Sequence, residues 1–130
     1  MQEVQTIKTE EVKPYSKNAK KHPTKQIKQI AESIKVFGFN QPLVLDSSKV
    51  IIVGHGRYEA AKYLELSEVP CVVVDLSEGD AKAYRLADNK LNESDWDMEL
   101  VIEELRGLDT SKVDITGFDS DLLIQIKEDE

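Results

Sequence analysis

Val50-Ile51-Ile52-Val53-Gly54-His55-Gly56-Arg57-Tyr58-Glu59-Ala60-Ala61 is the stretch around which the rest of this chain is organised. Its four β-branched apolar residues in a row predict a buried strand. Gly54 and Gly56 interrupt that strand, and the residues from Arg57 onward predict a helix. Because the first N–H groups of a helix have no intrahelical partners, this combination favours anion binding, and Arg57 adds a charged group suited to phosphate. Many such turns bind nothing, so the neighbouring segments must show whether this turn is part of an anion-binding site.

The segments before this stretch predict a helix and a β-hairpin. Apolar residues recur at helical spacing over residues 24–37, and Gly38 then favours a helix end. Two short apolar runs, residues 43–45 and 50–53, are separated by a polar turn and predict a hairpin. Residues 4–7 predict either a short edge strand or a frayed end.

The segment after the glycine turn predicts a central strand and a capped helix. Residues 69–74 are apolar throughout, which is typical of a strand buried on both faces. Ser77 is followed three residues later by Asp80, as in a helix capping box. The helix behind it is expected to turn Ala81, Tyr84, Ala87 and Leu91 toward the core. A different face of that helix is wholly polar and consists of Arg85, Asp88, Asn89 and Asn92.

The C-terminal part of the chain predicts a small helical extension. Asp97 is expected to cap a helix over residues 98–108. Residues 113–118 are expected to be extended, and a last helix is expected over residues 122–126 before an acidic end. The bend at residues 94–97 is the one candidate boundary between two parts.

Charge is unevenly distributed along this acidic chain of net charge −8. Residues 1–28 hold seven lysines and three glutamates, a net charge of +4, which leaves −12 for the remainder. Because long-range electrostatics do not draw an acidic chain to DNA, a DNA contact has to use the N-terminal lysines. Without further evidence, a solvated, partly disordered arm is the favoured interpretation of those lysines.

Length and composition indicate a cytoplasmic domain. The 130 residues suffice for a buried core without disulfides. No stretch approaches the roughly 20 apolar residues of a membrane span, and no signal peptide is visible. Cys71, the only cysteine, lies in an apolar run and is expected to be a buried, inert thiol.

Several separated motifs resemble those of the ParB/sulfiredoxin superfamily, most closely the ParB N-terminal-like ("ParB-like nuclease") domain. Asn18-Ala19-Lys20-Lys21 sits where ParB proteins have Gln-Pro-Arg, and Gln41-Pro42-Leu43-Val44 matches their Gln-Pro-Ile/Leu. The segment Gly54 to Ala60 matches Gly-Glu-Arg-Arg-x-x-Ala, and Asp88-Asn89 matches Glu-Asn. Versions with Gly-His-Gly-Arg and Ala-Asp-Asn are those of phage and mobile-element proteins, stand-alone or associated with methyltransferases.

The resemblance implies an α+β fold, with a small mixed sheet surrounded by helices. It implies a ParB-like domain over residues 1–93 and a helical C-terminal extension over residues 94–130 packed on it. It also implies binding of CTP or ATP together with Mg²⁺. The residues implied to bind the nucleotide are Asn18, Lys20, Gln41, Gly54, His55, Gly56 and Arg57. The residues implied to bind the metal ion are Asp88 and Asn89, whose side-chain oxygens suit a hard cation.

The family's function implies DNA transactions, such as chromosome or plasmid partition or DNA modification. The partners would be DNA, bound weakly through Lys17, Lys20, Lys21 and Lys25, and a DNA methyltransferase or another DNA-processing protein. The resemblance leaves the formation of a homodimer as an open alternative. About 35 residues follow Asn92, fewer than the DNA-binding and dimerisation domains of ParB proteins need, so we do not expect partition by this chain alone.

Departures from the family pattern keep two alternatives open. His55 and Gly56 replace a Glu and an Arg, so the turn has one positive charge less, and it lacks the cysteine that sulfiredoxin chemistry needs. One alternative is a ParB-fold enzyme, a nuclease, a small-molecule kinase or a slow NTP hydrolase, with His55 and Glu59 as acid–base groups. The other is a non-catalytic interaction module with a vestigial site.

Overall fold

A computed structural model describes residues 2–18, 20–119 and 121 of the chain. The chain divides into two compact units, residues 1–93 and 94–130, and each is described by itself. The elements of the first unit are β1 (Gln5–Lys8), the 3-10 helix η1 (Thr9–Glu11), α1 (Thr24–Phe37), β2 (Leu43–Leu45), β3 (Ile51–Val53), α2 (His55–Tyr63), β4 (Glu68–Val73) and α3 (Glu78–Leu91). Those of the second unit are α4 (Met98–Arg106) and α5 (Thr110–Ile115).

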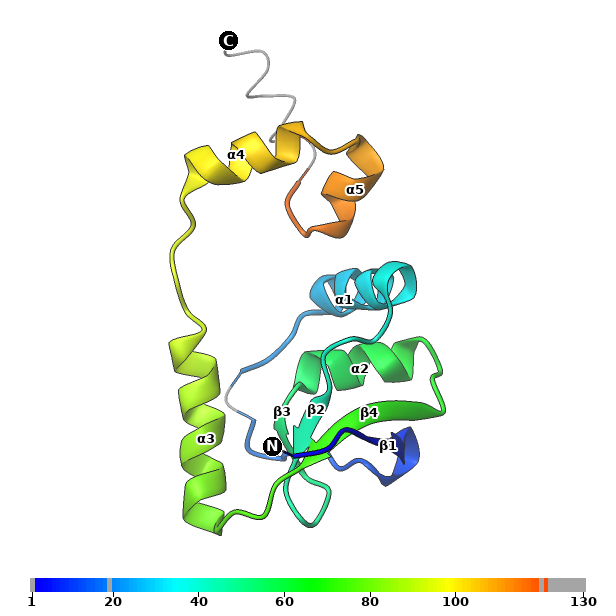
Figure 1. The fold of residues 1–130 in the computed structure, drawn as a ribbon, viewed down its shortest axis with the longest axis vertical. Helices are drawn as coiled ribbons and strands as arrows, with labels where there is room; N and C mark the ends of the chain where they lie inside the picture. Colours follow the sequence, from blue (N-terminus) through cyan, green and yellow to red (C-terminus); the bar gives the residue numbers. More distant parts are fainter. Residues whose placement is uncertain (1, 19, 120, 122–130) are drawn as a thin grey trace. The chain divides into compact units, whose positions relative to one another are not determined.

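A four-stranded mixed sheet with the order β1-β4-β2-β3 forms the centre of the first unit (Figure 1). Strand β4 runs antiparallel to β1 and parallel to β2, and β2 pairs antiparallel with β3. The predicted hairpin and the predicted central strand are therefore both present. The mixed sheet with its surrounding helices confirms the expected α+β fold class.

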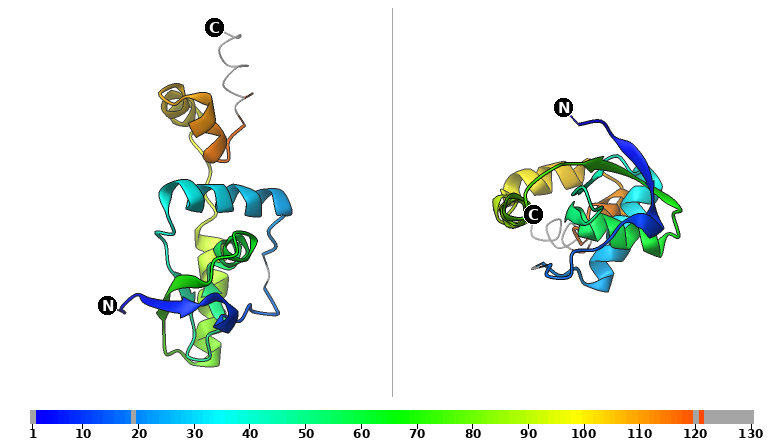
Figure 2. Two further views of the ribbon diagram at one scale, coloured as in Figure 1. Left: turned by 90° about the vertical axis from the view of Figure 1, so that its right-hand side faces the viewer. Right: turned by 90° about the horizontal axis from the view of Figure 1, so that it is seen from below.

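The helices of the first unit cover the sheet in layers. Helix α2 buries Tyr58, Ala60 and Ala61 against the strands, and α1 packs on α2 through a face that includes the buried Ala31. Figure 2 shows this stack of sheet, α2 and α1. Helix α3 lies beside β3, the edge strand at the other end of the sheet from β1 (Figure 1). The start of α2 thus faces both α1 and α3.

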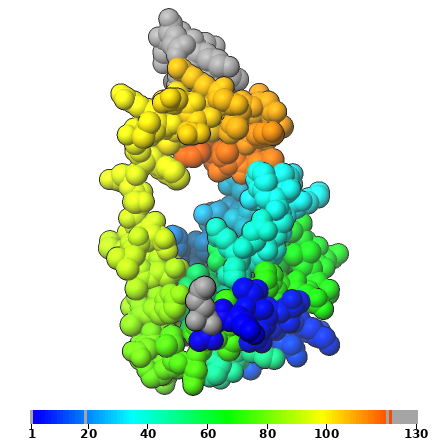
Figure 3. Space-filling view, viewed as in Figure 1, coloured from blue at the N-terminus to red at the C-terminus, as the bar shows by residue number. Residues whose placement is uncertain are grey.

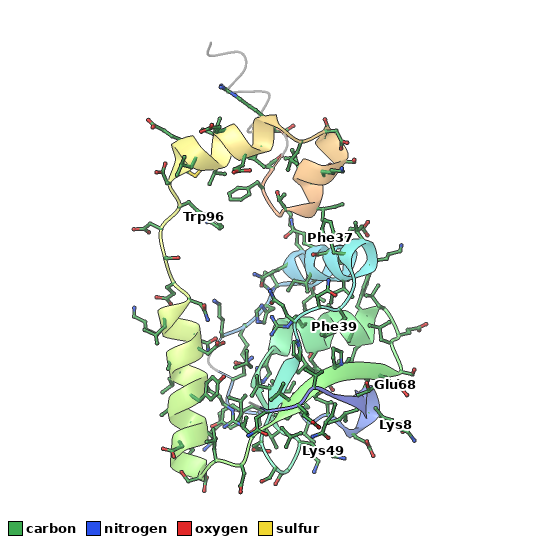
Figure 4. All side chains as sticks on the ribbon, viewed as in Figure 1. Lys8, Phe37, Phe39, Lys49, Glu68 and Trp96 are labelled. Carbon is green, nitrogen blue, oxygen red and sulfur yellow. The ribbon has the colours of Figure 1, made fainter. Side chains whose placement is uncertain are left out.

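The core lies between the sheet and α2. Leu43, Leu45 and Ile51 are fully buried there, and Phe39 packs against them from the connection after α1 (Figure 4). The single cysteine, Cys71, is buried in this core, and burial raises the pKa of its thiol to about 11. The inert thiol expected from the sequence is what the structure contains.

The outer edge of the sheet is polar. Lys8 on β1 lies opposite Glu68 on β4, and both are exposed (Figure 4). The dark blue atoms of β1 and η1 lie at the surface in Figure 3. Charged side chains on an edge strand oppose pairing with further strands.

The second unit has a small core of its own, built on α4 and α5. Asp97 caps α4 by accepting from the backbone N–H of Leu100, as predicted. The expected extended segment over residues 113–118 is wrong, because α5 covers residues 110–115. Asp109 caps that helix, which turns Val113 into the core. The last helix predicted, over residues 122–126, lies outside the described residues.

None of the helices in the described part of the chain is long and apolar enough to cross a membrane.

Gly54 sets the geometry of the turn between β3 and α2. Its backbone has φ +110°, a left-handed conformation that glycine adopts without steric cost. A Cβ atom at this position would lie 2.5 Å from Leu43 Cδ2, inside the core. Both the backbone conformation and the neighbouring strand therefore require glycine here.

Replacing this glycine should destabilise the first unit. We expect Gly54→Ala to lower the free energy of unfolding by about 2 kcal/mol or more, since backbone strain adds to overpacking against Leu43. Urea denaturation followed by circular dichroism measures the change. Gly79→Ala is the matched control, because it lies in α3 with nothing within 4 Å of an added Cβ. Alanine there should stabilise by about 0.5 kcal/mol. Equal effects of the two substitutions would contradict this account of the turn.

Candidate anion-binding site

A cavity of about 460 Å³ lies within the first unit. The loop before α1, the first turn of α2 and one face of α3 form its walls. Eight of the residues expected at a binding site line it: Asn18, Lys20, Gly54, His55, Gly56, Arg57, Asp88 and Asn89. The structure therefore brings three of the four separated sequence motifs together around one space, and the motif that begins at Gln41 lies outside its lining.

Two other expected site residues lie outside this lining. Gln41 accepts a hydrogen bond from Nη1 of Arg57, at 3.0 Å, so it supports a cavity residue. Glu59 pairs with Lys62 on the same helix, with 3.5 Å between the carboxylate and the ammonium group. Glu59 is therefore directed toward a helix neighbour, whereas His55 does line the cavity.

The cavity is strongly positive although the chain is acidic. Its lining contains five cationic side chains and one carboxylate, Asp88. The cationic residues are Lys17, Lys20, Arg57, Lys82 and Arg85. In a chain with 25 acidic and 17 basic residues, such a gathering favours a ligand with several negative charges.

The first turn of α2 presents backbone N–H groups to this space. The first intrahelical bond runs from the N–H of Tyr58 to the carbonyl of Gly54, so the three N–H groups before it have no helical acceptor. A Cβ atom on Gly56 would lie 3.0 Å from Ile30 Cδ1 and 3.1 Å from His22 Cε1. Glycine at this position therefore lets α1 and the preceding loop approach the helix start closely.

Arg57 is held in place mainly by backbone and amide groups. Besides its bond to Gln41, its Nη2 lies 3.5 Å from the carbonyl oxygen of Pro42, while its Nε is buried without a hydrogen-bond partner. Burial lowers the pKa of Arg57, and the nearby Asp88 carboxylate raises it. A guanidinium that keeps an unused donor can bind an anion without first breaking a strong ion pair.

His55 is held by a backbone hydrogen bond. Its Nε2 accepts from the N–H of Tyr15 at 3.2 Å, which places the ring proton on Nδ1. Burial, and after it the positive charge of Arg85, lower the pKa of His55 to about 4. The imidazole is therefore neutral near pH 7, and it fastens the loop that carries Lys17 and Asn18 to the start of α2.

Helix α3 faces the unit with a different side from the one expected. Of the predicted inward face only Ala81 is buried, together with Arg85, and the prediction is wrong for Tyr84, Ala87 and Leu91, which are exposed. The polar face is the inward one, because Asp88, Asn89 and Asn92 line the cavity. Hydrophobicity is no guide to orientation where a helix borders a polar site.

No ligand contact is predicted from the sequence for Tyr15, His22, Lys82 or Arg85, which also line this cavity, although Arg85 falls on the predicted polar face with Asp88. Arg85 lies three and four residues before Asp88 and Asn89, and that spacing puts all three on one helix face. This spacing is a sequence signal from which Arg85 could be assigned to the cavity. Tyr15 and His22 lie in an irregular loop, where spacing carries no such information.

Asp88 and Asn89 can supply part of a magnesium site. Nδ2 of Asn92 donates to Oδ1 of Asp88 at 3.1 Å and orients the carboxylate. Mg²⁺ is commonly held by one or two carboxylates, water and substrate phosphates. In the described part of the chain, no group of three or more His, Cys, Asp or Glu residues could form a complete protein cage. The donor set therefore fits a metal that arrives with a phosphate ligand.

This chain is similar to a ParB-like nuclease domain-containing protein and to probable chromosome-partitioning proteins. The ParB-like nuclease domain-containing protein YnaK of Escherichia coli K12 is 45% identical over 65 residues, which cover 50% of this chain and 75% of YnaK. The probable chromosome-partitioning protein ParB of Rickettsia bellii is 33% identical over 105 residues, which cover 80% of this chain. The match covers only 35% of the Rickettsia protein.

Solved structures share the fold. The C-terminally truncated chromosome-partitioning protein ParB from Caulobacter crescentus, complexed with CTP-gamma-S, superposes with a TM-score of 0.66 at 18% identity, covering 79% of this chain and 62% of that chain. Sulfiredoxin from Arabidopsis thaliana gives a TM-score of 0.54 at 16% identity, covering 63% of this chain and 96% of that one. Residues 1–90 match the ParB N-terminal domain family, so this chain belongs to that family and has the ParB/sulfiredoxin fold.

Proposed function

We propose that the first unit binds a nucleoside triphosphate with Mg²⁺ in the cavity described above, and that CTP is the first nucleotide to test. The observation that carries the proposal is the convergence of five cationic side chains and a helix N-terminus on one space. The Caulobacter ParB that shares the fold was solved with a CTP analogue, which supports the choice of nucleotide. The vestigial-site alternative is less well supported, because five cationic side chains line the cavity although the glycine turn itself has one arginine fewer than the family motif.

The roles follow from the walls of the cavity. The phosphates would lie at the start of α2, where N–H groups and Arg57 face them, and Asn18 and Lys20 would contact them from the loop. Asp88 and Asn89 would hold Mg²⁺, which would neutralise charge on the phosphate oxygens. The biological setting would be a DNA transaction, with a DNA methyltransferase or another DNA-processing protein as a partner.

Nucleotide binding should depend on both sides of the cavity. Isothermal titration calorimetry with CTP, ATP and GTP in the presence of Mg²⁺ should show binding of at least one nucleotide. Arg57→Ala and Asp88→Ala should each weaken it by roughly 10-fold or more, as expected for charge-assisted contacts. Lys62→Ala is the matched control, since Lys62 lies on α2 but outside the cavity lining. An absence of heat with every nucleotide at millimolar concentration would refute the proposed function.

We infer that His55 positions the loop and does not act as a base. Its Nε2 is occupied by the Tyr15 N–H, and its pKa of about 4 leaves it a weak base at neutral pH. Glu59, the other acid–base candidate, pairs with Lys62 and lies outside the cavity lining. The geometry therefore supports binding more strongly than catalysis by these two residues.

The low pKa of His55 predicts a pH dependence of stability. A histidine with a pKa near 6.5 unfolded and about 4 folded binds more protons in the unfolded state between these values, so stability should fall as pH decreases from 6.5 to 4. NMR titration of the imidazole should return a pKa near 4. His55→Gln should remove this part of the pH dependence, because Gln offers Tyr15 an acceptor that does not titrate. A measured pKa near 6.5 would show that the imidazole is not fixed in this way.

We further propose weak DNA contact through the N-terminal lysines. Lys21 and Lys25 are exposed, whereas Lys17 and Lys20 also line the cavity. Fluorescence anisotropy with a labelled duplex should show weak binding that raised salt abolishes, because such binding releases counterions. Lys21→Ala with Lys25→Ala should weaken it, while Lys90→Ala on α3 should not. Binding that persists at high salt would place the DNA surface elsewhere.

A further inference from the structure

The glycine turn carries one arginine, Arg57. Gly56 stands where the family motif has a second Arg, and it is buried. A side chain at Gly56 would crowd Ile30 Cδ1 at 3.0 Å and His22 Cε1 at 3.1 Å, so an arginine here would require both neighbours to move. If the cavity binds a polyphosphate, a second guanidinium has to come from another element.

Arg85 on α3 is such a group. It lines the same cavity, yet only 9% of the residue is exposed. Its Nε donates to the carbonyl of Ile51 at 2.9 Å, and its guanidinium carbon lies 3.8 Å from the centre of the Tyr15 ring. These two contacts fix the plane of the group, and neither of them neutralises its charge.

The remaining contact of Arg85 is weak. Its Nη2 lies 3.7 Å from Oδ2 of Asp46, beyond hydrogen-bond distance, and this buried nitrogen has no hydrogen-bond partner. Burying a guanidinium with incomplete hydrogen bonding is costly unless another group completes its shell. A bound anion would do so.

We propose that Arg85 is an anion-binding residue of this cavity and supplies from α3 the second guanidinium that the glycine turn lacks. This inference rests on the proposed function and narrows the class of ligand that the cavity is proposed to bind. Arg57 on α2 and Arg85 on α3 belong to different walls of the cavity, which favours a ligand that carries at least two anionic groups. Pyrophosphate, tripolyphosphate and nucleoside di- or triphosphates meet this description better than a single phosphate group does.

The geometry also assigns a role to Asp46. Its Oδ1 accepts from the N–H groups of Ser48 and Val50, which shapes the hairpin turn, while Oδ2 faces Arg85. In the free protein the carboxylate therefore competes with a ligand for the same guanidinium. Asp46→Asn keeps the turn acceptor and removes only the competing charge.

Calorimetry with simple anions and three variants tests the inference. The probes are inorganic phosphate, tripolyphosphate and CTP, the last two with Mg²⁺, and circular dichroism checks that each variant is folded. Arg85→Met keeps the apolar stem and should weaken tripolyphosphate binding by roughly 10-fold or more, with a much smaller effect on inorganic phosphate. Asp46→Asn should strengthen tripolyphosphate binding. Lys90→Met is the control, because Lys90 is an exposed cation on α3 outside the cavity lining.

The outcomes separate this inference from the proposed function. If CTP binding by Arg85→Met equals that of the unmodified chain, Arg85 is not a ligand contact, and nucleotide binding stands. If the unmodified chain binds tripolyphosphate through Arg85 but no nucleotide, Arg85 keeps its role and the nucleotide proposal fails. If the chain binds none of the probes, both are wrong. If Arg85→Met does not fold, the Asp46→Asn variant decides whether Arg85 contacts the ligand. Stronger tripolyphosphate binding in that variant supports the inference. Weaker binding would show that Arg85 acts only through its contact with the hairpin turn.

Discussion

Close backbone approach at Gly54 and Gly56 is the constraint on which the rest of the first unit depends. Leu43 from β2 packs beneath Gly54, and Ile30 and His22 lie over Gly56. The sheet, α2 and α1 are therefore brought together at one turn by the absence of two Cβ atoms. Since the cavity borders this turn, larger side chains here would change the fold and the site together.

The cavity concentrates positive charge that the fold only partly compensates. Arg57 has Gln41 and the more distant Asp88, and Arg85 has a backbone carbonyl, an aromatic face and a distant carboxylate. A core built for stability alone would replace such groups by apolar ones at little cost. Their presence in so acidic a chain supports the anionic ligand proposed for this cavity.

The sequence was sufficient for most elements of the first unit. Local patterns are strong there: Gly38 ends α1, Ser77 caps α3 by accepting from the N–H of Asp80, and unbroken apolar character places β4 inside the sheet. The short helix α5 was missed, because Val113 and Ile115 alternate as in a strand and the capping role of Asp109 was not recognised. In segments this short, helix and strand patterns are hard to distinguish.

Site residues that belong to a family motif could be predicted from the sequence. Site residues that are placed only by tertiary contacts could not. Asn18, Arg57 and Asp88 could be assigned to one pocket from a family resemblance, and the structure does bring them together. The inward direction of the polar face of α3 could not be read from hydrophobicity. The contact of Tyr15 with Arg85 joins residues 70 positions apart, and no local pattern encodes it.

Helix α3 joins one wall of the cavity covalently to the start of the second unit. This helix carries Arg85, Asp88 and Asn89 along one wall, and its last turn precedes Ser94, where the second unit begins. Only Asn92 and Glu93 separate the end of α3 from Ser94, so the direction of this helix also sets the direction in which the chain leaves the first unit.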